Sequence, residues 1–261
     1  MAHSYSDSTV LITGASSGLG AEFARQLAAR GADLVLVARR LDRLESLAAQ
    51  LRSRGRTVEV VAADLAAPGA ARALGAELES RGIRVDGLVN NAGFATRNRF
   101  EDEDPARIHE EVALNVAALV DLTREFYPQL QAAKRGVLVN VASTAAYQPV
   151  PWMAVYGATK SFVLSFTEAL WFENKTTSLQ VLALSPGATR TEFFDIAGEE
   201  ARVGAFQSAE EVVSLALRSL DGTNPPPSIV SGARNRATVV TSKLLTRRAL
   251  VNVTGSLTSR A

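Results

Sequence analysis

The 261-residue chain contains no cysteine, and its only two histidines are His3 and His109. The absence of cysteine excludes a disulfide framework and a metal site built from thiolates. Two histidines leave little material for a histidine-based zinc site or a Ser-His-Asp triad. We interpret His109 as an ordinary helix residue and expect no bound metal.

Long hydrophobic runs are missing as well. No uninterrupted apolar stretch approaches the length of a membrane-spanning helix, and the first residues, MAHSYSDS, lack the apolar run of a secretory signal. The sequence therefore predicts a soluble, cytoplasmic protein without a transmembrane segment.

Nothing in the sequence divides the chain into two domains. Hydrophobic residues make up 47% of the chain, which is enough to bury the core of one large α/β domain. The only proline-rich stretch, NPPPS at 224–228, lies too near the C-terminus to separate two domains. We therefore expect residues 1–261 to form a single domain.

Acidic residues are absent from the last forty positions, 222–261, so the C-terminal tail at about 233–261 is basic. We interpret this tail as a terminal helix packed on the domain or on a neighbouring subunit. A peripheral membrane contact and the docking of an acidic carrier are alternatives. Nucleic-acid binding is not expected, because no basic stripe with interleaved aromatic residues is present. The basic residues of the tail are Arg234, Arg236, Lys243, Arg247, Arg248 and Arg260.

Short apolar runs rich in β-branched residues alternate with longer helical patterns. Continuous apolar runs are typical of strands that are covered on both faces, and this alternation predicts an α/β fold with a doubly wound parallel sheet. Such a sheet binds ligands beyond the carboxyl ends of its strands. The expected strands lie at 9–13, 33–38, 57–63, 87–91, 136–143, 179–185 and 228–232, and the expected helices at 18–30, 41–54, 68–81, 105–133, 152–174 and 208–219.

A glycine-rich turn, TGASSGLG at 13–20, joins the first expected strand to the first expected helix. Its glycines allow backbone N–H groups and a helix N-terminus to approach a phosphate closely. The spacing differs from the common G-x-G-x-x-G pattern, but the place in the fold indicates a dinucleotide site. The predicted cofactor contacts in this turn are Gly14, Ser16, Ser17, Gly18, Leu19 and Gly20.

The second expected strand ends in VARR, where a fold that prefers NAD usually carries a carboxylate for the ribose hydroxyls. Here Ala38 takes that place and two arginines follow. A guanidinium suits the 2′-phosphate of NADP by charge and by geometry, so we predict NADP(H) as the cofactor. We favour Arg39 over Arg40 for this contact. The alternative is that both arginines lie at the head of a solvated helix.

The other strand ends carry groups that could contact the rest of a dinucleotide. Asp64 could accept a hydrogen bond from the adenine amino group with Leu65 against the ring, although a carboxylate near a helix start is an equally ordinary feature. The sequence NNAG at 90–93 lets the backbone approach a ligand, and we expect Asn90 to brace the sheet. Further predicted cofactor contacts are Asn91, Ala92, Gly93, Pro186, Gly187, Thr189 and Thr191.

Tyr156 and Lys160 lie four residues apart in VYGATKSFVLSF, which makes them neighbours on a helix, about 6 Å apart along its axis. This spacing alone also fits an exposed surface pair. Ser143 ends the fifth expected strand and on its own could be a turn residue. Asn115, inside a long helical pattern, could equally be a polar residue that bonds to a neighbouring helix.

Taken together, these motifs resemble the short-chain dehydrogenase/reductase family over about residues 8–232. The resemblance rests on Gly14-x-x-x-Gly18-x-Gly20, Asn90-Asn91-Ala92-Gly93, Asn115, Ser143, Tyr156-x-x-x-Lys160 and Pro186-Gly187, in this order. It implies a Rossmann-type sheet with strand order 3-2-1-4-5-6-7 and a nicotinamide cofactor. It also implies a dimer or tetramer formed through the helices at 105–133 and 152–174.

The same resemblance implies a catalytic group made of Asn115, Ser143, Tyr156 and Lys160. Hydride addition to a carbonyl leaves an alkoxide, and a tyrosine can protonate it only if its pKa falls from the ordinary value near 10. A cation within about 4 to 6 Å lowers a pKa by roughly 1 to 3 units, and we expect Lys160 to act in this way on Tyr156. By resemblance, Lys160 also holds the nicotinamide ribose, and the carbonyl of Asn115 holds a water that relays protons. Ser143 would donate a hydrogen bond to the substrate oxygen.

The expected substrate side is apolar and aromatic, which suits a medium-sized hydrophobic ketone or aldehyde. The segment 189–206 lies where the family places a mobile lid, with Gly198 and Gly204 as hinges. The sequence therefore predicts an NADPH-dependent carbonyl reductase or alcohol dehydrogenase. A 3-oxoacyl thioester reductase and a non-catalytic dinucleotide-sensing protein are the alternatives. The expected lining residues, which could instead pack in the core, are Phe94, Thr96, Tyr147, Pro149, Trp152, Met153, Phe193, Phe194 and Phe206.

Overall fold

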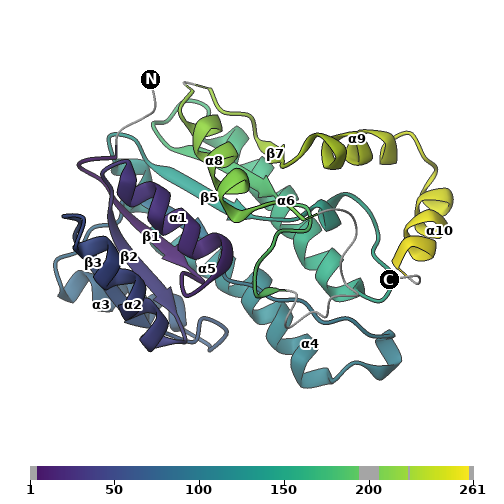
Figure 1. The fold of residues 1–261 in the computed structure, drawn as a ribbon, viewed down its shortest axis with the longest axis horizontal. Coiled ribbons are helices and arrows are strands. Elements are labelled where there is room, and N and C mark those ends of the chain that lie inside the picture. Colours follow the sequence, from purple (N-terminus) through teal and green to yellow (C-terminus); the bar gives the residue numbers. More distant parts are fainter. Residues whose placement is uncertain (1–4, 194–205, 223, 259–261) are drawn as a thin grey trace.

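The computed structural model describes residues 5–193, 206–222 and 224–258, whose strands form one seven-stranded sheet. The strand order is β3-β2-β1-β4-β5-β6-β7, and all neighbouring pairs are parallel, which confirms the predicted Rossmann topology (Figure 1). That residues 1–261 form a single domain stays a prediction. The strands are β1 Thr9–Thr13, β2 Asp33–Ala38, β3 Val58–Ala62, β4 Gly87–Asn90, β5 Val137–Val141, β6 Gln180–Ser185 and β7 Ser228–Val230.

Helices cover both faces of this sheet, which explains why the strands are apolar throughout. Along β2, Leu34 and Leu36 join the core beneath α1, α2 and α8, while Val35 and Val37 join the core beneath α3 and α5. This alternation follows from the two-residue period of a strand. The helices are α1 Gly18–Ala29, α2 Leu41–Arg52, α3 Ala70–Ser80, α4 Pro105–Val112, α5 Leu119–Ala132, α6 Ala154–Glu173, α8 Ala209–Leu220, α9 Ala233–Ser242 and α10 Arg247–Thr258.

The helix expected at 105–133 is interrupted. It begins as predicted, because the Asp104 carboxylate accepts a hydrogen bond from the backbone N–H of Ala106 at 2.9 Å and Pro105 is the first helical residue. Residues 113–118 then form a π-helical segment between α4 and α5. Such segments occur often at functional sites, and this one contains Asn115.

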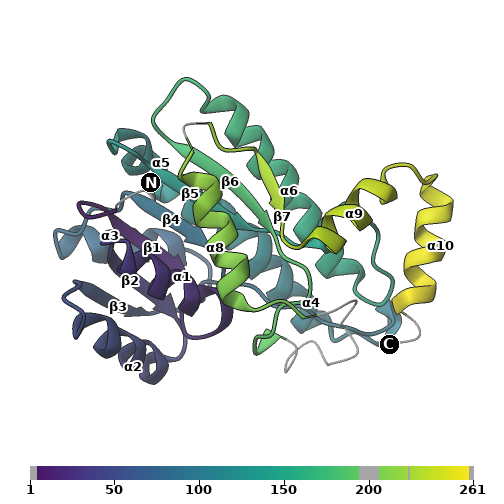
Figure 2. The same ribbon diagram turned by 45° about the horizontal axis from the view of Figure 1, so that its top comes forward.

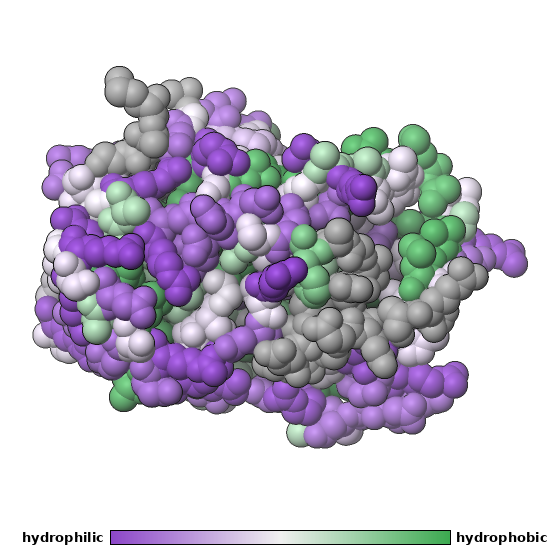
Figure 3. Space-filling model, in the orientation of Figure 1, coloured by the Kyte–Doolittle hydropathy of each residue, from purple (hydrophilic) through white to green (hydrophobic). Residues whose placement is uncertain are grey.

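The basic tail forms α9 and α10, and α10 turns back against the body of the protein (Figures 1 and 2). The Arg97 guanidinium donates a hydrogen bond to the backbone oxygen of Thr258 at 2.9 Å. This bond joins the end of α10 to the segment that follows β4. Residues 233–258 thus form two helices rather than one, and the second contacts the segment that carries Arg97. Apolar side chains remain exposed on these helices and on the turn between them, among them Val240 on α9 and Leu244 in the turn (Figure 3).

Across the described parts of the chain, none of the helices is both long enough and apolar enough to cross a membrane.

Candidate active site

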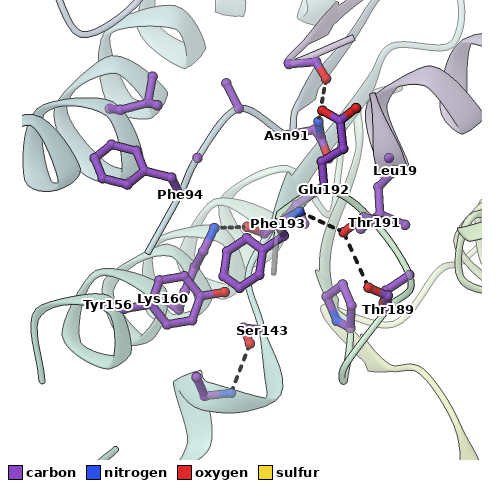
Figure 4. A pocket seen from close by; sticks show the side chains of 18 of the residues that line it. Leu19, Asn91, Phe94, Ser143, Tyr156, Lys160, Thr189, Thr191, Glu192 and Phe193 are labelled. Atoms are coloured by element: carbon purple, nitrogen blue, oxygen red, sulfur yellow. Dashed lines mark hydrogen bonds between the residues drawn. The ribbon is translucent and has the colours of Figure 1, made fainter. Parts of the chain in front are cut away.

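The carboxyl ends of the strands and the adjoining loops enclose a cavity of about 600 Å³, where most of the predicted site residues meet (Figure 4). Gly20 and Asn115 are the predicted site residues that do not line it. In the same described part of the chain, no cluster of histidine and acidic side chains has the composition of a metal site. The predicted residues that line the cavity are Gly14, Ser16, Ser17, Gly18, Leu19, Arg39, Arg40, Asp64, Leu65, Asn91, Ala92, Gly93, Ser143, Tyr156, Lys160, Pro186, Gly187, Thr189 and Thr191.

The glycine-rich turn is held tightly against β4. Gly14 and Gly18 have φ angles of +64° and +54°, in the region that favours glycine. A Cβ on Gly20 would lie 2.4 Å from the carbonyl oxygen of Gly14, so this position admits no side chain. The Asn91 amide donates to the backbone oxygen of Thr13 at 2.9 Å and fixes the start of the turn. The missing side chain at Gly20 thus allows the turn to fold closely. The helix α1 begins at Gly18, in the wall of the cavity.

The two arginines that directly follow β2 have different partners. The Arg40 guanidinium donates to the hydroxyls of Ser16 and Ser17, at 3.0 and 3.1 Å, and so lies against the glycine-rich turn. Arg39 instead forms an ion pair with Glu110 at 3.1 Å. The geometry therefore favours Arg40 for an anion beside this turn, whereas the sequence led us to favour Arg39.

Arg43, which the sequence analysis missed, also lines the cavity and shares the carboxylate of Glu192 with Arg40. Although burial acts in the opposite direction, the hydrogen bonds and charges of these arginines hold the pKa of Glu192 below its ordinary value. The pair thus forms a site for an anion. The available signal was the three-residue spacing of Arg40 and Arg43 at the start of a helix, which places them on one face.

Tyr156 and Lys160 are both buried on α6, with 8% and 6% of their surfaces exposed, so they are not a surface pair. The Lys160 ammonium lies 5.8 Å from the centre of the Tyr156 ring and donates to the backbone oxygen of Val141 at 2.8 Å. Ser143 Oγ accepts a hydrogen bond from the backbone N–H of Ala145 at 3.1 Å. Figure 4 shows the three side chains facing the same part of the cavity.

The pKa values in this cluster differ from the expectation drawn from the sequence. Burial raises the pKa of Tyr156 to about 12; a hydrogen bond with Ser143 acts against this shift, and the charge of Glu111 adds to it. Burial lowers the pKa of Lys160 to about 8, while Glu111 acts to raise it. The pKa of Tyr156 thus lies above its ordinary value in this structure, opposite to the expectation, because burial disfavours the phenolate.

Asn115 is buried and its side chain joins two segments. Its Oδ1 accepts from the backbone N–H of Phe94 at 3.1 Å, and its Nδ2 donates to the Phe94 oxygen at 2.9 Å and to Thr159 Oγ1 at 3.2 Å. The interpretation as a polar residue that bonds to a neighbouring helix is thus confirmed for the side chain, since Thr159 belongs to α6. The predicted role of the Asn115 carbonyl stays a prediction.

Asn90 braces the sheet as predicted. Its Nδ2 donates to Asn140 Oδ1 at 2.9 Å and to Thr123 Oγ1 at 3.0 Å, which links β4 to β5 and α5. All three side chains are buried.

The substrate side of the cavity is only partly as expected. Phe94, Met153 and Phe193 line it, and the rings of Tyr156 and Phe193 lie 5.5 Å apart between centroids. Phe194, Gly198 and Gly204 lie outside the described residues, as does most of the expected lid. Five expected lining residues do not contribute to the wall: Thr96, Tyr147, Pro149, Trp152 and Phe206.

Helix α10 supplies a wall that the sequence analysis did not assign. Thr254, Leu257 and Thr258 line the cavity from this helix. No motif in the sequence of the basic tail indicates whether the tail contacts the active site. The position of these three side chains in the cavity wall was therefore not predictable from the sequence.

Comparison with known proteins identifies the family. The family model for short chain dehydrogenases matches residues 8–201. The chain belongs to the short-chain dehydrogenase/reductase family. As a member it is an oxidoreductase of alcohol and carbonyl groups, and related structures hold NADP(H) or NADH, which supports a nicotinamide dinucleotide as its cofactor.

Relatives within the family differ in their named substrates. Sulfoacetaldehyde reductase 2 of Chromohalobacter salexigens is 37% identical over 206 residues, which cover 78% of this chain and 79% of that protein. A short-chain dehydrogenase from Sphingobium yanoikuyae in complex with NADPH is 36% identical, with a TM-score of 0.80, covering 91% of this chain and 94% of the other. A 7β-hydroxysteroid dehydrogenase is 28% identical, with a TM-score of 0.85, covering 95% and 96% of the two chains.

Proposed function

We propose that this short-chain dehydrogenase is an NADPH-dependent carbonyl reductase, reversible to alcohol oxidation, that acts on a medium-sized hydrophobic ketone or aldehyde. The observation that carries the proposal is the buried Tyr156 and Lys160 pair on the wall of a cavity that also holds Ser143. One end of this cavity is bounded by the glycine-rich turn and the arginines, and the other by apolar side chains.

The residues of the turn fit a dinucleotide phosphate. Gly20 leaves room for the backbone to fold closely, and the N-terminus of α1 offers unpaired N–H groups and the positive end of a helix dipole. Bound NADPH would supply the hydride. Pro186 and Gly187, which also line the cavity, would meet the nicotinamide carboxamide through their backbone groups.

The proton would come from Tyr156. Ser143 Oγ, which accepts from the N–H of Ala145, would donate its own proton to the carbonyl oxygen of the substrate. Tyr156 would then donate its phenolic proton to the alkoxide that forms at this oxygen. Lys160, whose pKa of about 8 keeps it mainly protonated at neutral pH, would stabilise the phenolate. The backbone carbonyl of Asn115, in its π-helical segment, would bind the water that returns a proton.

NADP preference is supported by the two arginines that hold Glu192. A carboxylate and a phosphate are both anions that accept hydrogen bonds from guanidinium groups, so the ion pairs of Arg40 and Arg43 with Glu192 support a 2′-phosphate site between these arginines. The NADPH complex of the Sphingobium relative agrees with this choice.

The substrate class follows from the remaining wall. Phe94, Met153, Phe193 and Leu257 are apolar, whereas Arg39, Arg40 and Arg43 come from the segment after β2, near the phosphate turn. An apolar ketone suits this wall better than a small charged aldehyde such as sulfoacetaldehyde.

A substrate panel tests the proposal. Purified protein is assayed with NADPH against aromatic, alicyclic and small charged carbonyl compounds, and the alcohol products are analysed for chirality. We expect turnover of the hydrophobic compounds and its loss in Tyr156→Phe. Tight NADPH binding with no turnover of any carbonyl would instead support the dinucleotide-sensing alternative.

The second enzymatic candidate is a 3-oxoacyl thioester reductase. A 3-ketoacyl-(acyl-carrier-protein) reductase from Brucella melitensis is 30% identical with a TM-score of 0.77. Faster reduction of the acyl thioester than of a free hydrophobic ketone would favour this candidate. In the carrier-docking case, Arg234→Ala and Arg236→Ala, at exposed positions of α9 outside the cavity wall, would impair only the thioester reaction.

We also propose a cytoplasmic homo-oligomer formed through α4, α5 and α6. Phe172 on α6 is 66% exposed, and Phe162 stacks on Phe166 with ring centres 5.9 Å apart on the same helix. Exposed aromatic side chains of this kind are typical of interfaces. Sedimentation of a dimer or tetramer that Phe172→Glu dissociates would support it.

A further inference from the structure

Glu111, on the last turn of α4, is a carboxyl group without solvent contact: its side chain is 0% exposed. Its Oε2 accepts hydrogen bonds from the backbone N–H of Thr96 at 3.2 Å and from Thr96 Oγ1 at 2.9 Å. Its Oε1 is buried and has no hydrogen-bond partner within the described residues. Fully buried carboxyl groups are rare in proteins unless they are paired, so this one calls for a functional explanation.

Glu111 and Asn115 lie four residues apart along the helical stretch 105–118, and both bind the segment 94–96, which begins at the cavity wall. Asn115 binds both backbone groups of Phe94, and Glu111 binds Thr96 two residues later. Asn115 also binds Thr159, the residue before Lys160. The carboxyl group is therefore built into the scaffold that supports the Tyr156 and Lys160 pair.

The charged and titratable groups around Glu111 come from three segments. From α6, which packs against α4, Lys160 and Tyr156 interact with its charge. Glu103, just before α4, is a like charge. On α4 itself, Arg107 stacks on the Phe94 ring at 4.3 Å and pairs with Glu110, so its charge is engaged elsewhere. The Lys160 ammonium donates to the Val141 oxygen and makes no direct hydrogen bond to Glu111, so the two charges act on each other across the contact between α4 and α6.

We propose that Glu111 is the buried counter-ion of Lys160, a positioning residue whose charge keeps the lysine protonated and thereby sets the pH range in which Tyr156 can exchange its proton. This inference rests on the proposed function only in its last part, because the charge of Lys160 is defined without any substrate.

The titration behaviour of both groups supports this assignment. Burial raises the pKa of Glu111 to about 7. The charge of Glu103 also raises this pKa, whereas the hydrogen bonds from Thr96 and the charge of Lys160 lower it. Burial lowers the pKa of Lys160 to about 8, and Glu111 opposes that shift. The two groups therefore ionise close to each other near neutral pH, as coupled sites do. Ionised Glu111 favours the ammonium form of Lys160 and disfavours the phenolate of Tyr156.

The decisive variant is Glu111→Gln, which keeps the size of the side chain and an oxygen for Thr96 but removes the charge. Glu77→Gln, on the surface of α3, makes the same chemical change far from the site. The protein without cofactor is labelled with 13Cε-lysine, and the lysine signals are titrated by NMR. Lys160→Arg assigns the signal of Lys160.

We expect the Lys160 pKa to fall by about one unit or more in Glu111→Gln, a tenfold or larger change in its protonation equilibrium, and to stay unchanged in Glu77→Gln. An unchanged Lys160 pKa in folded Glu111→Gln would overturn the proposal, since a merely structural role for Glu111 predicts that result. If the variant does not fold, infrared titration of the Glu111 carboxyl band in the wild-type protein and in Lys160→Met decides. Loss of the ammonium should raise the pH at which the protonated band disappears, which is about 7 in the wild type, and an unchanged transition would overturn the proposal.

A kinetic readout then connects the counter-ion to catalysis. The alkaline limb of kcat/KM for carbonyl reduction should move to lower pH in Glu111→Gln, while the KM for NADPH changes little. Glu111→Asp, which restores the charge, should move the limb back. If no carbonyl is reduced, the proposed function fails, but the NMR titration still tests the counter-ion.

Discussion

Replacing Glu111 with glutamine should change how the stability of the protein depends on pH. A carboxyl group whose pKa is raised on folding binds a proton more tightly in the folded than in the unfolded state. Its stabilising effect is therefore complete below the unfolded pKa and is lost as the pH rises through the folded pKa. For Glu111 the ordinary value is 4.5 and the folded value about 7, so the loss falls between these two pH values.

The magnitude follows from the same two values. At about 1.4 kcal/mol per pKa unit, the rise from 4.5 to about 7 corresponds to roughly 3 kcal/mol. The wild-type protein should lose this amount of unfolding free energy over that window relative to Glu111→Gln, which carries no ionisable group at the position. All other carboxyl groups and both histidines titrate in both proteins, so the difference between the two curves reports Glu111 together with the change that it causes in the titration of Lys160.

Equilibrium urea unfolding at intervals between pH 4.5 and 8, without cofactor, measures this difference. Glu77→Gln serves as the surface control, and its curve should run parallel to that of the wild type. If the free-energy difference between wild type and Glu111→Gln is the same at pH 5 and pH 8, the carboxyl group is not perturbed as described and the reasoning is refuted.

Three further variants test the rest of the site. Tyr156→Phe should lower the rate of carbonyl reduction by roughly 10²-fold or more while NADPH still binds, measured by single turnover and fluorescence titration; undiminished turnover would rule out the phenol as the acid. Arg40→Ala should lower kcat/KM with NADPH by roughly 10- to 100-fold and affect NADH little, because it removes charge-assisted hydrogen bonds; an equal effect from Arg39→Ala would contradict the geometric assignment. Gly20→Ala should abolish cofactor binding by calorimetry, since its Cβ would lie 2.4 Å from the Gly14 oxygen, and normal affinity would show that the turn can yield.

The sheet was predictable from the sequence because each strand is a short apolar run and each connection is a helix of ordinary length. The site was largely predictable for a related reason: parallel strands bring their carboxyl ends to one edge, so residues such as Ser143 and Pro186 that end strands meet in one cavity. What the sequence could not supply is the direction of side chains. Arg39 and Arg40 are adjacent, and only the structure places the second against Ser16 and Ser17.

Burial was the other quantity that sequence patterns did not reveal. The spacing of Tyr156 and Lys160 indicates proximity, but the desolvation that moves both pKa values depends on all the elements packed around them. Glu111 lies in HEEV, a segment that looks like a solvated helix face, and its burial depends on how α4 meets α6 and on the Thr96 segment. The π-helical segment around Asn115 likewise has no sequence mark, since the helical pattern continues through it.

The placement of α10 separates two tasks along the chain. The glycine-rich turn and the tyrosine and lysine pair lie before residue 161, while one wall of the same cavity comes from Thr254, Leu257 and Thr258. Substitutions in α10 can therefore change the shape of the cavity without replacing any residue of the glycine-rich turn or of the tyrosine and lysine pair. A library randomised at these three positions is an economical route to reductases with new selectivity.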